Sequence, residues 1–238
     1  MRPTRPFESV YFDCDSTLTR IEGVDELAAS MPSGRRDELR GLTDLAMNGA
    51  VPLADIYGRR LDVLRPSRDA LAAIGTRYVE TLVDGAAAVV AVLHALGKSV
   101  GIVSGGLRPA VVVVGKRLGI DPSDVHAVDV AFEADGSYRD FDRASPFARN
   151  GGKPEFFARL PAERRPVALV GDGVTDLEAA TAVERFVGFG GVELRERVIA
   201  GTPFFVAVPT LLPTLDYLLT EAESAKVAAD PRLRRLLL

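Results

Sequence analysis

The stretch SVYFDCDST, residues 9–17, joins a short apolar run to two aspartates that flank the only cysteine of the chain. SVYF has the length and the β-branched and aromatic composition of a buried strand. Asp13 and Asp15 follow where such a strand would leave its sheet, and their spacing lets both present oxygen to one site. The stretch therefore predicts a strand with a polar site at its carboxyl end.

Two further apolar runs end in polar residues. SVGIV leads into Ser104, VALV leads into Gly171 and Asp172, and helical segments lie between or after these runs. Strands that alternate with helices predict an α/β fold with a doubly wound, mainly parallel sheet of the Rossmann type. Because ligands of such sheets bind at the carboxyl ends of the strands, we expect the three polar ends to form one site.

Between Arg20 and Asp84 the strand-like runs give way to charged, helical patterns. Apolar positions recur at helical spacing in LADIYGRRLDVL, and Ser67 is a suitable N-cap for the helix that follows. A helical insertion above the strand ends would act as a lid. The predicted division of the chain is a core of residues 1–19 and 85–222, a helical-bundle cap of residues 20–84 and a tail of residues 223–238.

Two features of the second half complete the predicted fold. Asp135-Gly136 separates two alternating runs within residues 128–142, which is a strong signal for a β-hairpin. The runs RFVGF, residues 185–189, and FFVAV, residues 204–208, are expected to extend the sheet.

Size and composition restrict the class of protein. The 238 residues, 47% of them apolar, are enough for a sizeable core, and the net charge of -4 disfavours a general nucleic-acid or membrane binder. The longest apolar stretch, residues 86–97, is shorter than the roughly 20 residues of a membrane span and predicts a buried helix. With one cysteine and no apolar signal segment at the N-terminus, we expect a cytoplasmic protein.

The chemistry of the first stretch has two possible carriers. Cys14 and Arg20 have the C-x5-R spacing of thiolate phosphatases, but a reactive thiolate needs electropositive surroundings and Cys14 lies between two carboxylates. The aspartates are the stronger candidates. Asp13 and Asp15, together with Asp172 and Asp176, supply the hard oxygen ligands that suit Mg²⁺.

Phosphate binding also requires hydrogen-bond donors and positive charge. Ser104-Gly105-Gly106 precedes a predicted helix, so its hydroxyl and amides could hold an anion, although a simple helix cap would have the same pattern. Lys153 follows Asn-Gly-Gly and opens another helix, where a cation is unfavourable unless an anion lies nearby. Lys153 could instead be an ordinary exposed lysine.

Two charged residues of the insertion are candidates for substrate recognition. Arg60 lies at i+4 from Ile56, within an apolar helix face, so its guanidinium either extends outward or meets an anion such as a carboxylate. Glu22 could pair with an ammonium group, and its alternative is an exposed carboxylate at a helix start.

Five motifs occur in the order seen in the haloacid dehalogenase superfamily: FDCDSTLTRIEGVDELA, GAVPLADIYGRRL, IVSGGLRP, NGGK and GDGVTDLEA. The chain resembles this superfamily over roughly residues 8–219, and the insertion is similar to that of its phosphoserine-hydrolysing branch. The resemblance implies a HAD-like fold and the Mg²⁺-dependent hydrolysis of O-phospho-L-serine to L-serine and phosphate, a reaction of L-serine biosynthesis. It implies a small phosphomonoester as the partner, no nucleic acid or membrane, and a monomer or homodimer.

The resemblance also implies roles for individual residues. Asp13 would be the nucleophile, and Asp15 the general acid and base. Mg²⁺ would be held by the Asp13 side chain, the backbone carbonyl of Asp15 and Asp172, with Asp176 supporting the water ligands of the metal.

The remaining implied roles concern the substrate. The phosphoryl group would be bound by Ser104 and Lys153 with the amides of Gly105 and Gly106, the amino and carboxylate groups of serine would be bound by Glu22 and Arg60, and the pocket would be lined by Met47 and Thr175.

Two alternatives to hydrolysis of phosphoserine remain. A related enzyme could pass the phosphoryl group to another alcohol or act on another small phosphorylated metabolite. A non-catalytic phosphate-binding module could use the glycines, but it gives no reason for Asp13, Asp15, Lys153 and Asp172 to occur together.

Overall fold

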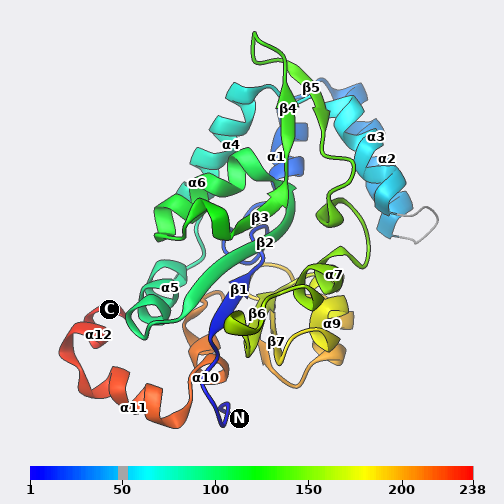
Figure 1. Ribbon diagram of the computed structural model, residues 1–238. Helices are drawn as coiled ribbons and strands as arrows, with labels where there is room; N and C mark the ends of the chain where they lie inside the picture. Colours follow the sequence, from blue (N-terminus) through cyan, green and yellow to red (C-terminus); the bar gives the residue numbers. More distant parts are fainter. Residues whose placement is uncertain (48–52, 238) are drawn as a thin grey trace.

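The core of the computed structural model, which describes residues 1–47 and 53–237, is a six-stranded sheet (Figure 1). For residues 40, 41, 43–47 and 53 only the backbone is described. The strand order is β3-β2-β1-β6-β7-β8, and the described pairs are parallel, which confirms the predicted sheet. The strands of this sheet are β1 (Ser9–Phe12), β2 (Ser99–Leu107), β3 (Val125–Val128), β6 (Val167–Gly171), β7 (Arg185–Phe189) and β8 (Phe205–Val206).

Helices cover both faces of the sheet, and the alternation of residues along β1 shows why. Val10 and Phe12 belong to a large apolar cluster that contains α5 and α6, whereas Tyr11 belongs to a second cluster with Phe157 of α7. Successive strand residues point to opposite faces, so a continuous apolar run is stable only when both faces are covered. The helices of the core are α5 (Ala86–Ala95), α6 (Arg108–Leu118), α7 (Gly152–Ala158), α8 (Val174–Glu178) and α9 (Glu196–Gly201), followed by α10 (Leu215–Leu218), α11 (Glu221–Ala229) and α12 (Pro231–Arg235).

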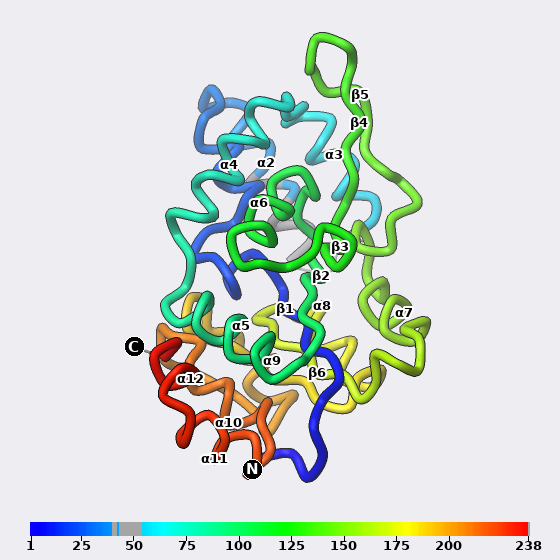
Figure 2. Tube along the Cα trace, turned by 60° about the vertical axis from the view of Figure 1, so that its left-hand side comes forward, coloured from blue at the N-terminus to red at the C-terminus, as the bar shows by residue number. Residues whose placement is uncertain are grey.

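Five described α-helices lie in the chain between β1 and β2, and the last of them is α5 of the core. We call the first four the cap helices: α1 (Gly23–Ala29), α2 (Ser33–Met47), α3 (Leu53–Leu64) and α4 (Arg68–Glu80). Ser67 caps α4, accepting a hydrogen bond from the Ala70 N–H as its sequence position predicts. The cap helices gather beyond the carboxyl ends of the strands, away from the two chain termini (Figures 1 and 2).

The predicted hairpin is present as the antiparallel pair β4 (Val130–Phe132) and β5 (Tyr138–Phe141). Gly136 has φ 85°, which favours glycine in the turn. The hairpin follows β3 in the chain, yet it extends beside the cap helices (Figure 1). The Arg68 N–H donates to the Gly136 carbonyl at 2.9 Å, a normal distance for a backbone hydrogen bond. The ring centroids of Tyr57 in α3 and Phe141 in β5 lie 5.4 Å apart.

The second strand is longer than its sequence pattern suggests. β2 continues through Ser104, Gly105 and Gly106 as far as Leu107, and α6 begins only at Arg108. Its pairing with β3 shifts register between Val103 and Leu107, so the backbone remains extended while it leaves the regular ladder.

A buried ion pair connects α11, which follows β8 in the chain, to the core. Lys98, whose side chain is 3% exposed, lies with Nζ 2.6 Å from Oε1 of Glu223 and donates to the Phe7 carbonyl. Among the described residues, no helix combines the length and apolar character needed to cross a membrane.

Candidate active site

The site begins where β1 ends. The Asp13 N–H donates to the Val170 carbonyl, which holds Asp13 at the end of the sheet beside β6. One carboxylate oxygen, Oδ1, accepts the Cys14 N–H at 2.7 Å, and the other, Oδ2, lies 2.9 Å from Nζ of Lys153. Lys153 is 4% exposed and belongs to the first turn of α7. It is therefore a buried cation facing carboxylates, in contrast to the alternative of an exposed lysine.

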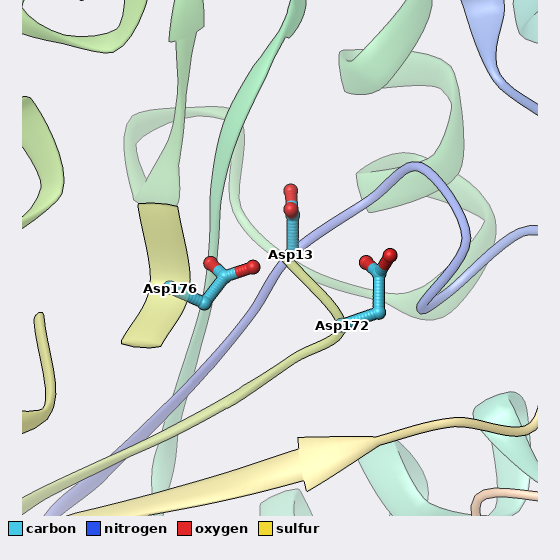
Figure 3. A group of neighbouring side chains, drawn as sticks. All are labelled: Asp13, Asp172 and Asp176. Atoms are coloured by element: carbon cyan, nitrogen blue, oxygen red, sulfur yellow. The ribbon is translucent and has the colours of Figure 1, made fainter. Parts of the chain in front are cut away.

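Three aspartates converge at this point (Figure 3). Asp13 follows β1, Asp172 follows β6 and Asp176 lies in α8, and one oxygen atom from each lies within 4.8 Å of the others. The β1–β6 pair lies where the strand order changes direction, which is the usual ligand site of such sheets. Three hard oxygen donors at this spacing could hold a divalent cation.

The carboxylates of the site repel one another. Burial raises the pKa of Asp172 to about 6, and the charge of Asp13 adds to the increase. Burial and the charge of Asp13 also raise the pKa of Asp176 well above its ordinary value. Burial lowers the pKa of Lys153, but Asp13 and Asp176 outweigh this effect and hold it above its ordinary value. A bound divalent cation would relieve this repulsion, so the donor set fits Mg²⁺.

Asp15 lies on the cap side of Asp13. Its Oδ1 accepts two hydrogen bonds, from the Gly23 N–H at 2.8 Å and from the Tyr78 hydroxyl at 2.5 Å. Burial raises the pKa of Asp15 to about 6, although the Tyr78 hydrogen bond acts in the opposite direction. A carboxyl group with this pKa can exchange a proton near neutral pH, as a general acid and base must.

The predicted phosphate-binding segment lies beside Asp15. Ser104 is fully buried, and its Oγ accepts the Gly106 N–H at 3.0 Å. A Cβ atom at Gly106 would lie 2.9 Å from Oδ2 of Asp15, so only glycine fits without displacing the carboxylate. The Gly105 carbonyl accepts the Tyr57 hydroxyl at 2.8 Å, which links this segment to α3 of the cap helices.

Glu22 and Arg60 contribute charge from the cap side. Glu22 accepts the Ser16 hydroxyl at 2.6 Å, and burial raises its pKa to about 7, with the charge of Asp15 adding to the increase. It is thus a partly buried carboxylate of the site. Arg60 is mostly buried, its Nε has no hydrogen-bond partner among the described residues, and its nearest described carboxylate is Asp25 at 4.0 Å.

These groups enclose a cavity of about 220 Å³ between the strand ends and the cap helices. The predicted site residues that line it are Asp13, Asp15, Glu22, Arg60, Ser104, Gly105, Gly106, Lys153, Asp172 and Thr175. Asp176 lies behind the cavity wall, where it accepts the Gly173 N–H and contacts Lys153. Met47 ends α2, and its side chain lies outside the described part of the chain.

Comparison with known proteins places the chain in a family. Residues 7–184 match the family model for haloacid dehalogenase-like hydrolases. The chain belongs to this family. It is 33% identical over 201 residues to phosphoserine phosphatase of Rattus norvegicus, covering 84% of this chain and 88% of the relative. It is 32% identical over 217 residues to the chloroplastic phosphoserine phosphatase of Arabidopsis thaliana, covering 89% of this chain and 73% of the relative.

A solved structure described as a phospho-aspartyl intermediate analogue of phosphoserine phosphatase has the same fold, with a TM-score of 0.72 at 22% identity. The match covers 90% of this chain and 100% of that one. The HAD-like core expected from the sequence is therefore confirmed, and so is the resemblance to the phosphoserine-hydrolysing branch.

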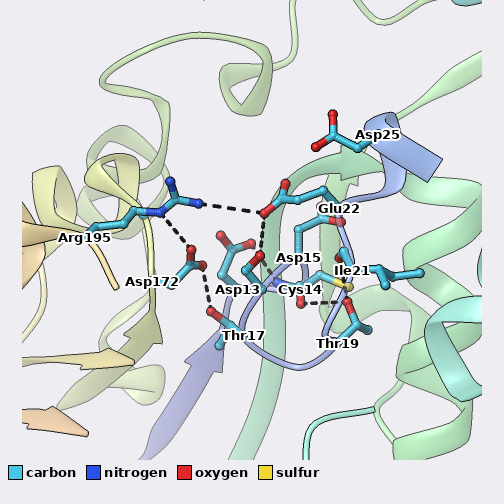
Figure 4. A network of polar contacts seen from close by, with 12 residues as sticks. Asp13, Cys14, Asp15, Thr17, Thr19, Ile21, Glu22, Asp25, Asp172 and Arg195 are labelled. Carbon is cyan, nitrogen blue, oxygen red and sulfur yellow. Dashed lines mark hydrogen bonds and ion pairs between the residues drawn. The ribbon is translucent and has the colours of Figure 1, made fainter. Parts of the chain in front are cut away.

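This hydrolase has further cavity residues that sequence reasoning missed. Arg195 lies in the loop after β7, with Nε 3.1 Å from Oδ2 of Asp172 and Nη2 3.9 Å from Oε1 of Glu22 (Figure 4). The predicted strand RFVGF could have indicated this residue. The loop that follows a fourth parallel strand lies at the carboxyl edge of the sheet, where the site is. Tyr57 gave no such signal, since its ring fits the apolar helix face and only its hydroxyl reaches the site.

The structure contradicts the hypothesis that the Cys14 thiolate is the nucleophile of this hydrolase. Cys14 is fully buried in the main apolar cluster and is absent from the cavity wall. Burial and the charges of Asp15 and Asp13 raise the pKa of its thiol well above the ordinary value. Arg20 lies 3.1 Å from Asp84 instead of activating a thiolate. The neighbouring Thr17 hydroxyl donates to Asp172 at 3.0 Å (Figure 4).

Proposed function

We propose that this haloacid dehalogenase-like hydrolase converts O-phospho-L-serine and water into L-serine and inorganic phosphate. The observation that carries the proposal is one cavity with two chemically different ends: Asp13 beside Lys153 at the strand ends, and Glu22 with Arg60 on the cap side. The first pair suits a phosphoryl group. The second pair suits the ammonium and carboxylate groups of an amino acid. The phosphoserine phosphatases of rat and Arabidopsis support the same substrate.

The reaction would proceed in two steps. A carboxylate oxygen of Asp13 attacks phosphorus, the bond from phosphorus to the serine oxygen breaks, and Asp15 gives its proton to that oxygen. Asp15 then accepts a proton from a water molecule as the water oxygen attacks phosphorus. The bond between phosphorus and the Asp13 oxygen breaks, which releases phosphate and restores the Asp13 carboxylate. The raised pKa of Asp15, about 6, supports its role as the proton carrier. The phospho-aspartyl analogue named for a protein of the same fold supports the intermediate.

Other groups would bind and orient the phosphoryl oxygens. Lys153 supplies a buried positive charge, and Ser104 supplies a hydroxyl from the end of β2. Asp13, Asp172 and the backbone carbonyl of Asp15 would hold Mg²⁺, and bound Mg²⁺ would neutralise the repulsion between a nucleophilic carboxylate and the phosphoryl oxygens. The cap helices would exclude bulk water from the cavity.

The test is a phosphate-release screen of the purified protein with a set of small phosphorylated metabolites that includes O-phospho-L-serine. We expect the highest kcat/KM for O-phospho-L-serine, loss of activity in EDTA and recovery on addition of Mg²⁺. Parallel reactions with small alcohols distinguish hydrolysis from transfer. Substrate consumption with an alcohol product and little free phosphate would identify a phosphotransferase, and another preferred phosphomonoester would overturn the proposed substrate.

A further inference from the structure

The two carboxylate oxygens of Asp15 have different surroundings. Oδ1 accepts both the Gly23 N–H and the Tyr78 hydroxyl. Oδ2 faces Gly106, at a distance that leaves no room for a Cβ atom, and no described residue donates a hydrogen bond to it. One oxygen is therefore held by two donors while the other remains available toward the phosphate-binding segment.

Both donors come from the cap helices. Gly23 is the first residue of α1, and Tyr78 lies in α4, where its side chain is almost fully buried. The two residues fit one another closely, because a Cβ atom at Gly23 would lie 2.1 Å from the Tyr78 hydroxyl oxygen. A glycine at position 23 thus gives its own amide to Asp15 and also leaves the space through which the phenol reaches the same oxygen.

We propose that Tyr78 is a positioning residue that fixes Oδ1 of Asp15, so that Oδ2 gives the proton to the leaving oxygen and accepts one from water. The inference rests on the proposed function. A carboxylate with two donors on one oxygen cannot rotate without losing both hydrogen bonds, so its second oxygen keeps one orientation through both steps. Tyr78 itself does not touch the reacting atoms.

Tyr78→Phe tests this role because it removes the hydroxyl and keeps the ring. We compare kcat/KM for O-phospho-L-serine, whose alkoxide leaving group needs a proton, with kcat/KM for p-nitrophenyl phosphate, whose leaving group does not. Since general acid catalysis contributes about 10²- to 10⁴-fold, we expect kcat/KM to fall about 10- to 100-fold for O-phospho-L-serine and less than about 3-fold for p-nitrophenyl phosphate. The loss should be in kcat, with KM for O-phospho-L-serine nearly unchanged.

Tyr138→Phe is the matched control. It also removes a buried phenolic hydroxyl, but that hydroxyl has no hydrogen-bond partner among the described residues. Both substrates should be hydrolysed by this variant as by the wild type. Gly23→Ala is a second test, because the added methyl group displaces the Tyr78 hydroxyl, and it should reproduce the selective loss if Tyr78→Phe does not fold.

Equal losses for the two substrates, or no loss, in a folded Tyr78→Phe protein would overturn the positioning role. Failure of the proposed function is distinguishable, because it shows in the wild type. If the wild type hydrolyses a different alkyl phosphomonoester, that ester replaces O-phospho-L-serine in the comparison. If the wild type hydrolyses no phosphomonoester, both proposals fail.

Discussion

The ammonium nitrogen of Lys153, in the first turn of α7, lies 2.9 Å from Oδ2 of Asp13, which follows β1 at the carboxyl end of the sheet. Asp13 and Asp176 raise the pKa of Lys153 above its ordinary value despite burial, so the lysine remains protonated at physiological pH. A permanent positive charge therefore lies beside the proposed nucleophile, at the end of the cavity where we propose that the phosphoryl group binds.

Asp13→Asn should abolish turnover. The amide keeps the size of the side chain but cannot attack phosphorus, and we expect phosphate release to fall about 10⁴-fold or more, with no hydroxylamine-sensitive phosphoenzyme. Asp37→Asn, at an exposed position in α2, is the control and should behave as the wild type. Normal turnover by Asp13→Asn would contradict the aspartyl-phosphate mechanism.

Cys14→Ala and Cys14→Val should retain activity, because the thiol packs in the apolar core and not in the cavity. We expect kcat/KM within about 3-fold of the wild type, together with a lower Tm from the changed packing, a cost of roughly 1 kcal/mol. Steady-state kinetics and thermal unfolding measure the two effects separately. Complete loss of activity in a variant with an unchanged Tm would restore the thiolate hypothesis.

Arg60→Ala should impair recognition of the substrate carboxylate. A hydrogen bond to a charged group contributes about 1.5–3 kcal/mol, so KM for O-phospho-L-serine should rise about 10- to 100-fold. O-phosphoethanolamine keeps the ammonium group and lacks the carboxylate, and its KM should change less than about 3-fold. Arg59→Ala, one residue away and exposed, is the control. Equal changes for both substrates would remove Arg60 from carboxylate recognition.

Tyr57→Phe should weaken the link between α3 and the Ser104 segment, because it removes the hydroxyl that donates to the Gly105 carbonyl. A neutral hydrogen bond contributes about 0.5–1.5 kcal/mol, so KM for O-phospho-L-serine should rise about 2- to 10-fold with little change in kcat. This pattern is the reverse of that expected for Tyr78→Phe. A selective loss of kcat in Tyr57→Phe would show that the link serves the chemical step instead of binding.

Glu223→Gln should destabilise the protein in a pH-dependent manner. Burial raises the pKa of Glu223, but the hydrogen bonds from Lys98 and Thr220 outweigh it and lower the pKa overall. A depressed pKa stabilises the folded state above the unfolded value of about 4.3, and this stabilisation is lost as the pH falls through the lower folded value. We therefore expect a Tm several degrees below that of the wild type at pH 7, corresponding to roughly 1–2 kcal/mol, and a smaller difference below about pH 4.

The control for this prediction is Glu221→Gln. Glu221 lies in the same helix and pairs with Arg2 at 3.2 Å, but its side chain is 89% exposed. Surface ion pairs contribute little, so its Tm should stay within about one degree of the wild type. A Glu223→Gln difference in Tm that does not change with pH would contradict the ionic origin of the stabilisation.

The ends of β1 and β6 could be predicted because each is encoded locally, as an apolar run followed by Asp13 or by Gly171-Asp172. The end of β2 was predicted too early, because the strand continues past Ser104 to Leu107. Contacts between residues that are distant in sequence could not be predicted. Tyr57 and Tyr78 satisfy helical periodicity as apolar residues, and only the fold shows which atoms their hydroxyl groups meet. Arg195 follows a correctly predicted strand, but the residues near it in sequence do not indicate that its loop runs toward Asp172.

The contacts of the hairpin β4–β5 limit how the segment that contains the cap helices could be exchanged with that of a relative. The cap predicted from the sequence, residues 20–84, is contiguous in the chain. Arg65 and Arg68 of this segment nevertheless donate hydrogen bonds to the backbone carbonyls of Tyr138 and Gly136 in the hairpin. A chimera that replaced residues 20–84 alone would place a foreign surface against those carbonyls. The residues that would have to be exchanged together are discontinuous in sequence. A chimera should therefore replace residues 20–84 and 130–141 at the same time.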